Sequence, residues 1–188
     1  MSKKGNGQLA TLRLLIFVSV YGFALGGCDK IAHNIPLTRC ENDGIIFSYP
    51  FYWSLIEEKT GSDHKLISVS GPLGSAILLS IYPSERAITL SEYSRMISDS
   101  FRALDNVYGT AEPDIEFTDV EDTIGGRKVS GIREIYYDNP GTVEAPLKRD
   151  YFLIGRKKSA VYLLFQTDEE NSFERKLLQR IKDSFAFQ

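Results

Sequence analysis

The chain has 188 residues, of which 43% are hydrophobic, and a formal net charge of −3. This length suits one ordinary domain with its own hydrophobic core, and the negative charge argues against a nucleic-acid partner. The sequence contains two cysteines and two histidines, so we expect neither a disulfide framework nor a zinc site.

The first 27 residues have the organisation of a secretory signal peptide. Lys3, Lys4 and Arg13 precede an apolar run over residues 14–25, and no acidic residue interrupts them. A run of about a dozen residues is too short for a transmembrane helix, which needs about 20. We therefore expect a cleaved signal over residues 1–27, with an uncleaved membrane anchor as the alternative. Its removal leaves 19 basic and 25 acidic residues, a net charge of −6.

The end of this segment, Leu25-Gly26-Gly27-Cys28, resembles the lipobox of bacterial lipoproteins. The resemblance implies that Leu25, Gly26 and Gly27 direct cleavage. It also implies that Cys28 is lipidated on its sulfur and often acylated, for example with palmitate, on its new amino group. Two or three acyl chains hold a protein stably at a membrane. Asp29 resembles the retention signal of enteric bacteria, which implies the inner membrane, periplasmic side, rather than the outer membrane.

The mature chain is expected to begin with a tether and continue as one domain. Residues 28–43 contain Pro36 and show little periodicity, which predicts a lipidated N-terminus and a flexible tether. Residues 44–188 then form the domain. Cys40, within the tether, has two interpretations. It is a reactive thiol or forms a disulfide bridge to another molecule, or it is an ordinary buried cysteine near the domain edge.

Alternating or continuous apolar runs, bounded by glycine and proline turns, predict most of the strands. Pro50, Gly71-Pro72 and Gly125-Gly126 are such turns. Asp114 to Val120 alternates acidic and apolar residues, as an exposed strand does. The predicted strands cover residues 45–49, 53–57, 65–70, 75–82, 114–120, 127–137, 148–154 and 160–166.

Two helices are predicted between and after these strands. Thr89 and Glu92 have the spacing of a capping box, which starts a helix over residues 90–104 with one apolar face. Phe173, Leu177, Ile181 and Phe185, four residues apart, predict a C-terminal helix. Strands joined by short turns, with helices packed on them, indicate an α+β fold built on a mostly antiparallel sheet.

Several features in this order resemble the PsbP-like family, named for the extrinsic photosystem II protein. They are Phe47-Ser48-Tyr49-Pro50 followed by Trp53, Gly71-Pro72, the long helix, Ile124-Gly125-Gly126, the strand with Tyr162-Leu163-Leu164-Phe165, and Ile181-Lys182-Asp183-Ser184-Phe185. The resemblance implies an α/β/α sandwich over residues 44–186. Bacterial lipoproteins of the DcrB type share this fold and begin with Cys-Asp. It also implies a non-enzymatic binding or assembly module without shared catalytic residues.

No catalytic, metal or cofactor site is predicted. His33 and His64 lack neighbours at metal-ligand spacing, and nucleophile elbows and phosphate loops are absent. The weak candidates for a cation are Asp114, Glu116 and Asp119. However, calcium needs six to eight converging oxygens, and a strand spreads these carboxylates along its length.

Two surface features are candidates for a site that binds a partner. The turn Arg156-Lys157-Lys158 is either a contact for lipid headgroups or an acidic partner, or a plain solvated hairpin tip. Clustered aromatic residues supply either core or interface; they are Tyr49, Phe51, Tyr52, Trp53, Tyr136, Tyr137, Tyr151 and Phe152.

The expected function is that of a membrane-anchored periplasmic lipoprotein which binds another envelope protein, without enzymatic activity. The alternative is a carrier domain that binds a small ligand or a cation in a groove between the sheet and a helix.

Overall fold

The computed structural model describes residues 32–60, 64–107, 114–137, 146–168 and 171–188. The chain divides into two units, residues 1–35 and 36–188. Of the first unit only residues 32–35 are described, and residues 32–34 form a helical turn. Within the described part of the chain, none of the helices is both long and apolar enough to cross a membrane.

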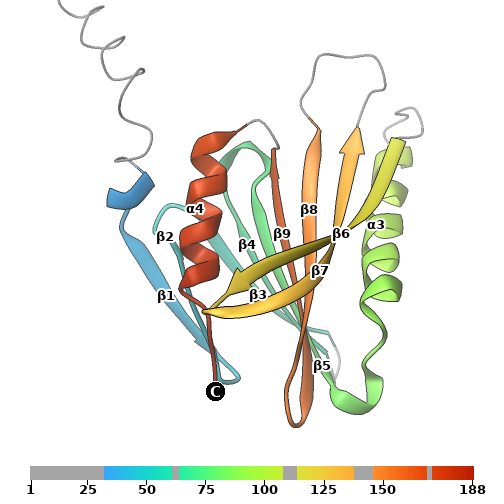
Figure 1. Ribbon diagram of the computed structural model, residues 1–188, viewed down its shortest axis with the longest axis horizontal. Helices are drawn as coiled ribbons and strands as arrows, with labels where there is room; N and C mark the ends of the chain where they lie inside the picture. The colour runs from blue at the N-terminus through green and yellow to red at the C-terminus, as the bar shows by residue number, and fades with distance from the viewer. Residues whose placement is uncertain (1–31, 61–63, 108–113, 138–145, 169–170) are drawn as a thin grey trace, which may run out of the picture. The chain divides into compact units, whose positions relative to one another are not determined.

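A seven-stranded antiparallel sheet forms the centre of the second unit (Figure 1). The interior strands β5, β8 and β9 carry mostly buried side chains because both faces of the sheet are covered. In spatial order the strands are β3 (Ser54–Thr60), β4 (His64–Ser70), β5 (Ala76–Pro83), β9 (Ser159–Asp168), β8 (Leu147–Gly155), β7 (Arg127–Tyr137) and β6 (Asp114–Ile124).

Helix α3 (Leu90–Val107) covers one face of this sheet, against β7 and β8. The predicted capping box is present: the Glu92 backbone N–H donates to the Thr89 hydroxyl over 3.2 Å, and the Glu92 carboxylate accepts from the Thr89 N–H over 2.8 Å. Below the helix, the rings of Tyr93 and Tyr162 stack with their centroids 4.2 Å apart. Two 3₁₀ turns, Pro72–Gly74 and Ser84–Arg86, flank β5.

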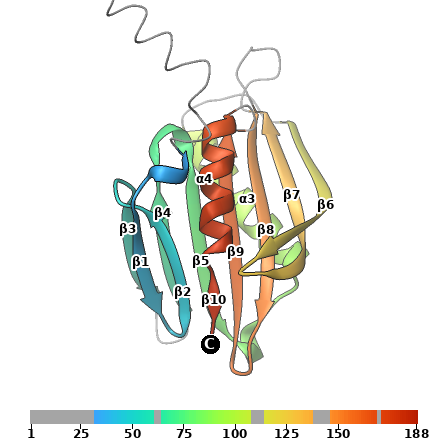
Figure 2. The ribbon, with the colours of Figure 1, turned by 60° about the vertical axis from the view of Figure 1, so that its left-hand side comes forward.

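The opposite face carries helix α4 (Ser172–Asp183) and a three-stranded sheet (Figure 2). That sheet has the order β1 (Leu37–Asn42), β2 (Ile45–Pro50) and β10 (Ala186–Phe187). Phe47 of β2 stacks on Phe185 with ring centroids 4.9 Å apart, and Phe185 meets Phe165 of β9 edge to face. These rings form the core between the two sheets.

The predicted fold class is confirmed: the second unit is an α+β sandwich whose sheets are antiparallel. All eight predicted strands and both helices are present, with bounds that differ by a few residues. Phe185 lies beyond the end of α4, because the Ser184 N–H bonds to the carbonyls of Arg180 and Ile181 and closes the helix there.

The tether prediction was wrong for residues 37–42. They form β1, which pairs antiparallel with β2 from Leu37–Pro50 to Asn42–Ile45. Along β1 only Cys40 is buried, so the segment lacks an apolar pattern of its own and owes its extended form to the ladder with β2. The second unit consequently begins at Pro36, eight residues before the predicted start of the domain at residue 44.

Candidate functional site

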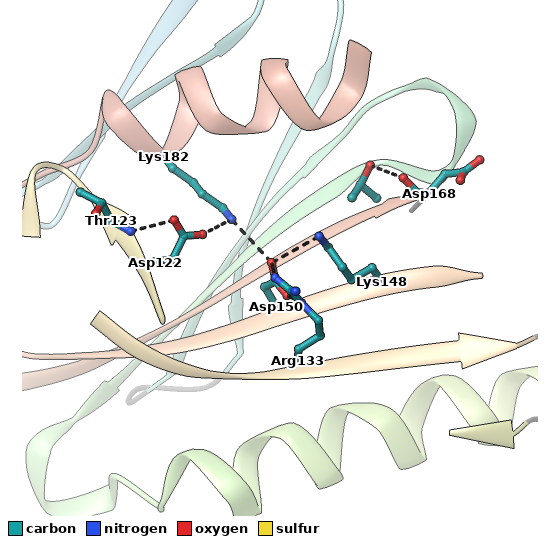
Figure 3. Close-up of polar contacts among 8 residues, drawn as sticks. Asp122, Thr123, Arg133, Lys148, Asp150, Asp168 and Lys182 are labelled. Atoms are coloured by element: carbon teal, nitrogen blue, oxygen red, sulfur yellow. Dashed lines mark hydrogen bonds and ion pairs between the residues drawn. The ribbon is translucent and has the colours of Figure 1, made fainter. Parts of the chain in front are cut away.

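The candidate site is built around Asp150, a buried carboxylate on the α4 side of the sheet. Residue Asp150 is 3% exposed. The β7–β8 register places Arg133 directly opposite it, and the guanidinium binds both carboxylate oxygens, Nε at 2.7 Å and Nη2 at 3.2 Å. Lys182 Nζ and Lys148 Nζ approach the second oxygen to 3.7 and 4.0 Å (Figure 3). Three cationic side chains thus surround one carboxylate.

Lys182 links this carboxylate to the edge of the sheet. Its Nζ lies 2.6 Å from Asp122 Oδ2 on β6, and the other Asp122 oxygen accepts from the Thr123 N–H over 2.7 Å (Figure 3). The Lys182 side chain is 9% exposed, and its ammonium lies 4.9 Å from the centre of the Phe165 ring. Such contacts with carboxylates and a ring face offset part of the desolvation of a buried ammonium.

A groove of about 300 Å³ opens beside these residues, between α4 and strands β6 to β9. Its charged lining comprises four basic side chains and three acidic ones, with Leu178 and Phe165 as apolar contacts. Among the residues that line it there is no histidine, cysteine or serine. The groove can therefore hold a polar ligand or a partner's side chain. The charged residues are Arg133, Lys148, Arg175, Lys182, Glu121, Asp122 and Asp150.

Glu174, in the first turn of α4, is a second buried acid on this side of the sheet. It is 2% exposed and accepts a hydrogen bond from the Ser75 hydroxyl. Burial raises the pKa of Glu174, and the nearby Asp168 adds to the rise. The first turn of α4 is fixed by Asn171, whose side-chain oxygen accepts from the Glu174 N–H over 3.2 Å.

On the α3 side a separate ionic cluster centres on Glu134, which is fully buried. It accepts from Arg149 Nη1 at 3.1 Å, from the Ser98 hydroxyl at 2.8 Å and from the Tyr151 hydroxyl. The Arg149 guanidinium also lies 4.1 Å from the Phe101 ring centre. Burial raises the pKa of Tyr151, and the Glu134 charge raises it further. These groups are satisfied inside the fold and join α3 to the sheet.

The structure does not bring the three weak cation candidates together. The side chains of β6 alternate between the two faces of the sheet, so Asp119 lies on the face opposite Asp114 and Glu116. Within the described residues no group of three or more His, Cys, Asp or Glu side chains is arranged to hold a metal. The lipobox residues Leu25, Gly26, Gly27 and Cys28, and Asp29 after them, lie outside the described residues.

Cys40 and the histidines occupy ordinary positions. Cys40 is 5% exposed, in agreement with the buried alternative. His64 begins β4 and stacks on Tyr82 with ring centroids 4.3 Å apart, where burial lowers its pKa. His33 is exposed.

The basic turn is partly structural. The Arg156 guanidinium donates to the backbone oxygens of Asp43 and Gln188, at 2.6 and 2.7 Å, and so ties the β8–β9 hairpin to the C-terminus. Lys157 and Lys158 are exposed. Of the three basic residues of this turn, only Lys157 and Lys158 therefore match the solvated hairpin tip that the sequence offered as an alternative.

The clustered aromatic residues divide between core and surface. Five of the eight are buried: Tyr49, Trp53, Tyr136, Tyr151 and Phe152. The exposed ones are Phe51 at 63%, Tyr52 at 42% and Tyr137 at 39%. Core packing therefore explains the five buried residues and leaves Phe51, Tyr52 and Tyr137 at the surface.

Asp150, Arg133, Lys148 and Lys182 were missed from the sequence. A usable signal was present, since Asp150 directly precedes the apolar run Tyr151-Phe152-Leu153-Ile154 of a predicted strand, and a charged residue that is buried needs a partner. The identity of that partner depends on strand register and on the placement of α4, which no local pattern contains.

Comparison with known proteins gives a structural likeness without a sequence match. No family model matches the chain, and no curated protein matches it by sequence. The solution structure of cyanobacterial PsbP (CyanoP) from Synechocystis is similar, with 15% identity, a TM-score of 0.51 and coverage of 81% of this chain and 92% of that one. A crystal structure from Bacteroides thetaiotaomicron aligns with 11% identity and a TM-score of 0.42 over 77% of this chain and 45% of that one. The likeness to CyanoP establishes the fold: the domain is a PsbP-like α/β/α sandwich.

Proposed function

We propose that the chain is a membrane-tethered binding or assembly module of the bacterial cell envelope, without enzymatic activity of its own. The observation that carries the proposal is the PsbP-like sandwich, joined in one chain to a lipobox-like start. The buried charged groups support it, since the ion pairs and hydrogen bonds of Asp150 and Glu134 are made with neighbours within the fold. Because one fold serves many functions, the proposal rests on this combination and not on the fold alone.

The proposed address follows from the first 29 residues. Cleavage before Cys28 and acylation of that cysteine place the domain at a membrane as a lipoprotein, in the manner of the DcrB type. Asp29 favours the inner membrane, with the domain on the periplasmic side. The mature net charge of −6 makes the acyl chains, and not electrostatic attraction to anionic lipid, the main source of membrane affinity.

The groove beside α4 is the surface we assign to an envelope protein partner. Gln179 lies at its rim and is exposed, which makes it a suitable position for a photo-crosslinking amino acid in living cells. Met96, 43% exposed on α3 at the other face of the sheet, is the matched control. One protein captured reproducibly from position 179 and not from position 96 supports the assignment. Identical capture from both positions, or none from 179, contradicts it.

The second candidate function, a small-ligand or cation carrier, is favoured by the existence of the same groove. A ligand that binds the native domain must raise its thermal stability. Calcium is a poor fit because Arg133 and Lys182 already occupy the carboxylates it would need. A rise in melting temperature with millimolar calcium, lost in Asp150→Asn, would favour the cation version over the assembly module.

A further inference from the structure

The turn between β2 and β3 carries two large aromatic side chains at its tip. The Trp53 N–H donates to the Pro50 carbonyl over 2.9 Å, which leaves Phe51 and Tyr52 as the central residues of a tight turn. Turn tips are usually occupied by Gly, Pro, Asn, Asp or Ser. Phe51 is 63% exposed and Tyr52 is 42% exposed, with their rings edge to face at 5.5 Å. Folding gains little from rings in this position.

The tip is held rigidly by residues on both sides of it. The Trp53 ring is 5% exposed and packs so closely on Gly71 that a Cβ there would overlap it. On the other side the Phe51 N–H donates to the Pro36 carbonyl over 3.2 Å. The backbone that carries the two exposed rings is therefore held on both sides, which lowers the entropic cost of ordering it in a contact.

The tip lies beside the residue at which the folded unit begins. Pro36 is the first residue of the folded unit, and Leu37 pairs with Pro50, so the tip lies at the point where the N-terminal segment enters the domain. Eight residue steps separate Pro36 from Cys28, and an extended chain covers at most about 29 Å in that length. If Cys28 carries acyl chains, as the proposed function requires, this end of the domain stays within that distance of the lipid surface.

We propose that Phe51 and Tyr52 form a membrane-docking tip, which enters the interfacial layer of the bilayer that holds the anchor. A phenol with an apolar body and a polar end suits the headgroup boundary, and the neighbouring phenyl ring adds apolar area. The mature chain is acidic, so docking depends on these rings and not on attraction to anionic headgroups. The contact would orient the domain and keep one end of it fixed against the membrane.

The test places a tryptophan at the tip of the full-length, host-processed chain in phosphatidylcholine vesicles with brominated acyl chains. Phe51→Trp is compared with Phe117→Trp and with the parent chain. Phe117 is a matched control because it is 41% exposed on β6, the far edge of the seven-stranded sheet. Trp53, the single native tryptophan, is buried and supplies a constant background. We expect the added emission of Phe51→Trp to shift to the blue and to lose most of its intensity to bromine, while that of Phe117→Trp keeps its intensity.

The outcomes separate the tip from the anchor. An acylated chain that floats with the vesicles but shows no more quenching for Phe51→Trp than for Phe117→Trp overturns the docking tip and leaves the anchor standing. Quenching of Phe51→Trp in a chain that proves not to be acylated supports the tip and overturns the anchor. A chain that neither carries acyl groups nor floats overturns both. A fourth outcome is a tip that is not quenched in a chain that forms a dimer, where Phe51→Ser converts the dimer to a monomer. This result overturns the membrane contact and assigns the tip to a homodimer interface.

Discussion

Lys182 on α4 lies 2.6 Å from Asp122 on β6 and 3.7 Å from Asp150 on β8, so one buried ammonium joins the helix to two strands of the sheet. Removing it leaves Asp122 without its cation, and Asp150 with Arg133 and Lys148. We therefore expect Lys182→Met to lower the free energy of unfolding by about 2–3 kcal/mol. This value lies between the cost of losing one hydrogen bond to a charged group and the cost of breaking a fully buried ion pair. Urea denaturation measures this. The control, Lys176→Met on the exposed side of α4, should change it by under about 1 kcal/mol.

The Glu134 cluster should be more sensitive, because its carboxylate is fully buried and serves three donors. Glu134→Gln keeps the shape but leaves the Arg149 charge, on a residue that is 3% exposed, without its anion. We expect a loss of about 3–5 kcal/mol in the free energy of unfolding. Glu116→Gln on the exposed face of β6 is the control and should change it by under about 0.5 kcal/mol. Similar values for the two variants would show that the buried pair contributes nothing specific.

The turn between β6 and β7 offers a pair of adjacent glycines with different surroundings. Gly125 has φ +57° and Gly126 has φ +73°, so alanine is strained at both, by about 1–2 kcal/mol. A Cβ at Gly125 would also overlap the Phe185 carbonyl oxygen, whereas nothing lies within 4 Å of one at Gly126. Gly125→Ala should therefore lower the melting temperature clearly more than Gly126→Ala. Equal losses would mean that the C-terminal segment does not pack on this turn.

Alkaline pH should weaken the core under α3. Burial raises the pKa of Tyr93 to about 12 from an ordinary 10.0, so the folded state holds this proton more tightly than the unfolded chain does. Its contribution is fully present below pH 10 and is lost as the pH rises toward 12, by about 2–3 kcal/mol. Tyr93→Phe removes this part of the alkaline decline, although at neutral pH it leaves the Ser80 hydroxyl without its 2.8 Å partner.

Stability curves of the parent chain and Tyr93→Phe between neutral pH and pH 12 check this prediction. A parent chain and a Tyr93→Phe variant that lose stability in parallel above pH 10 would contradict the argument.

Local signals predicted the elements of the fold well. The capping box at Thr89 and Glu92 is a relation between residues three apart, and its hydrogen bonds are present as expected. The alternation that predicted the strand from Asp114 reflects a ladder with β7 that runs without a break from Asp114–Tyr137 to Ile124–Arg127. Both relations involve neighbours in sequence or a tight turn, so the pattern itself contains the contact.

The candidate site depended on contacts that no local pattern contains. Asp122 and Lys182 are 60 residues apart, and Asp150 meets Arg133 only through the β7–β8 register. β1 was mistaken for tether for the same reason, because its partner β2 supplies the pairing and Cys40 is its only buried residue. Phe51 and Tyr52 were noticed as part of an aromatic cluster, but their exposure follows from the turn that Trp53 closes.

The proposed function depends most on the anchor at Cys28, and mass spectrometry of the mature N-terminus from separated inner and outer membranes tests this anchor directly. We predict an acylated peptide that begins at Cys28, recovered from the inner membrane and absent when Cys28→Ala is expressed. An unmodified chain that begins at Met1 would contradict the account, since the protein would then keep its first 27 residues and carry no lipid on that cysteine.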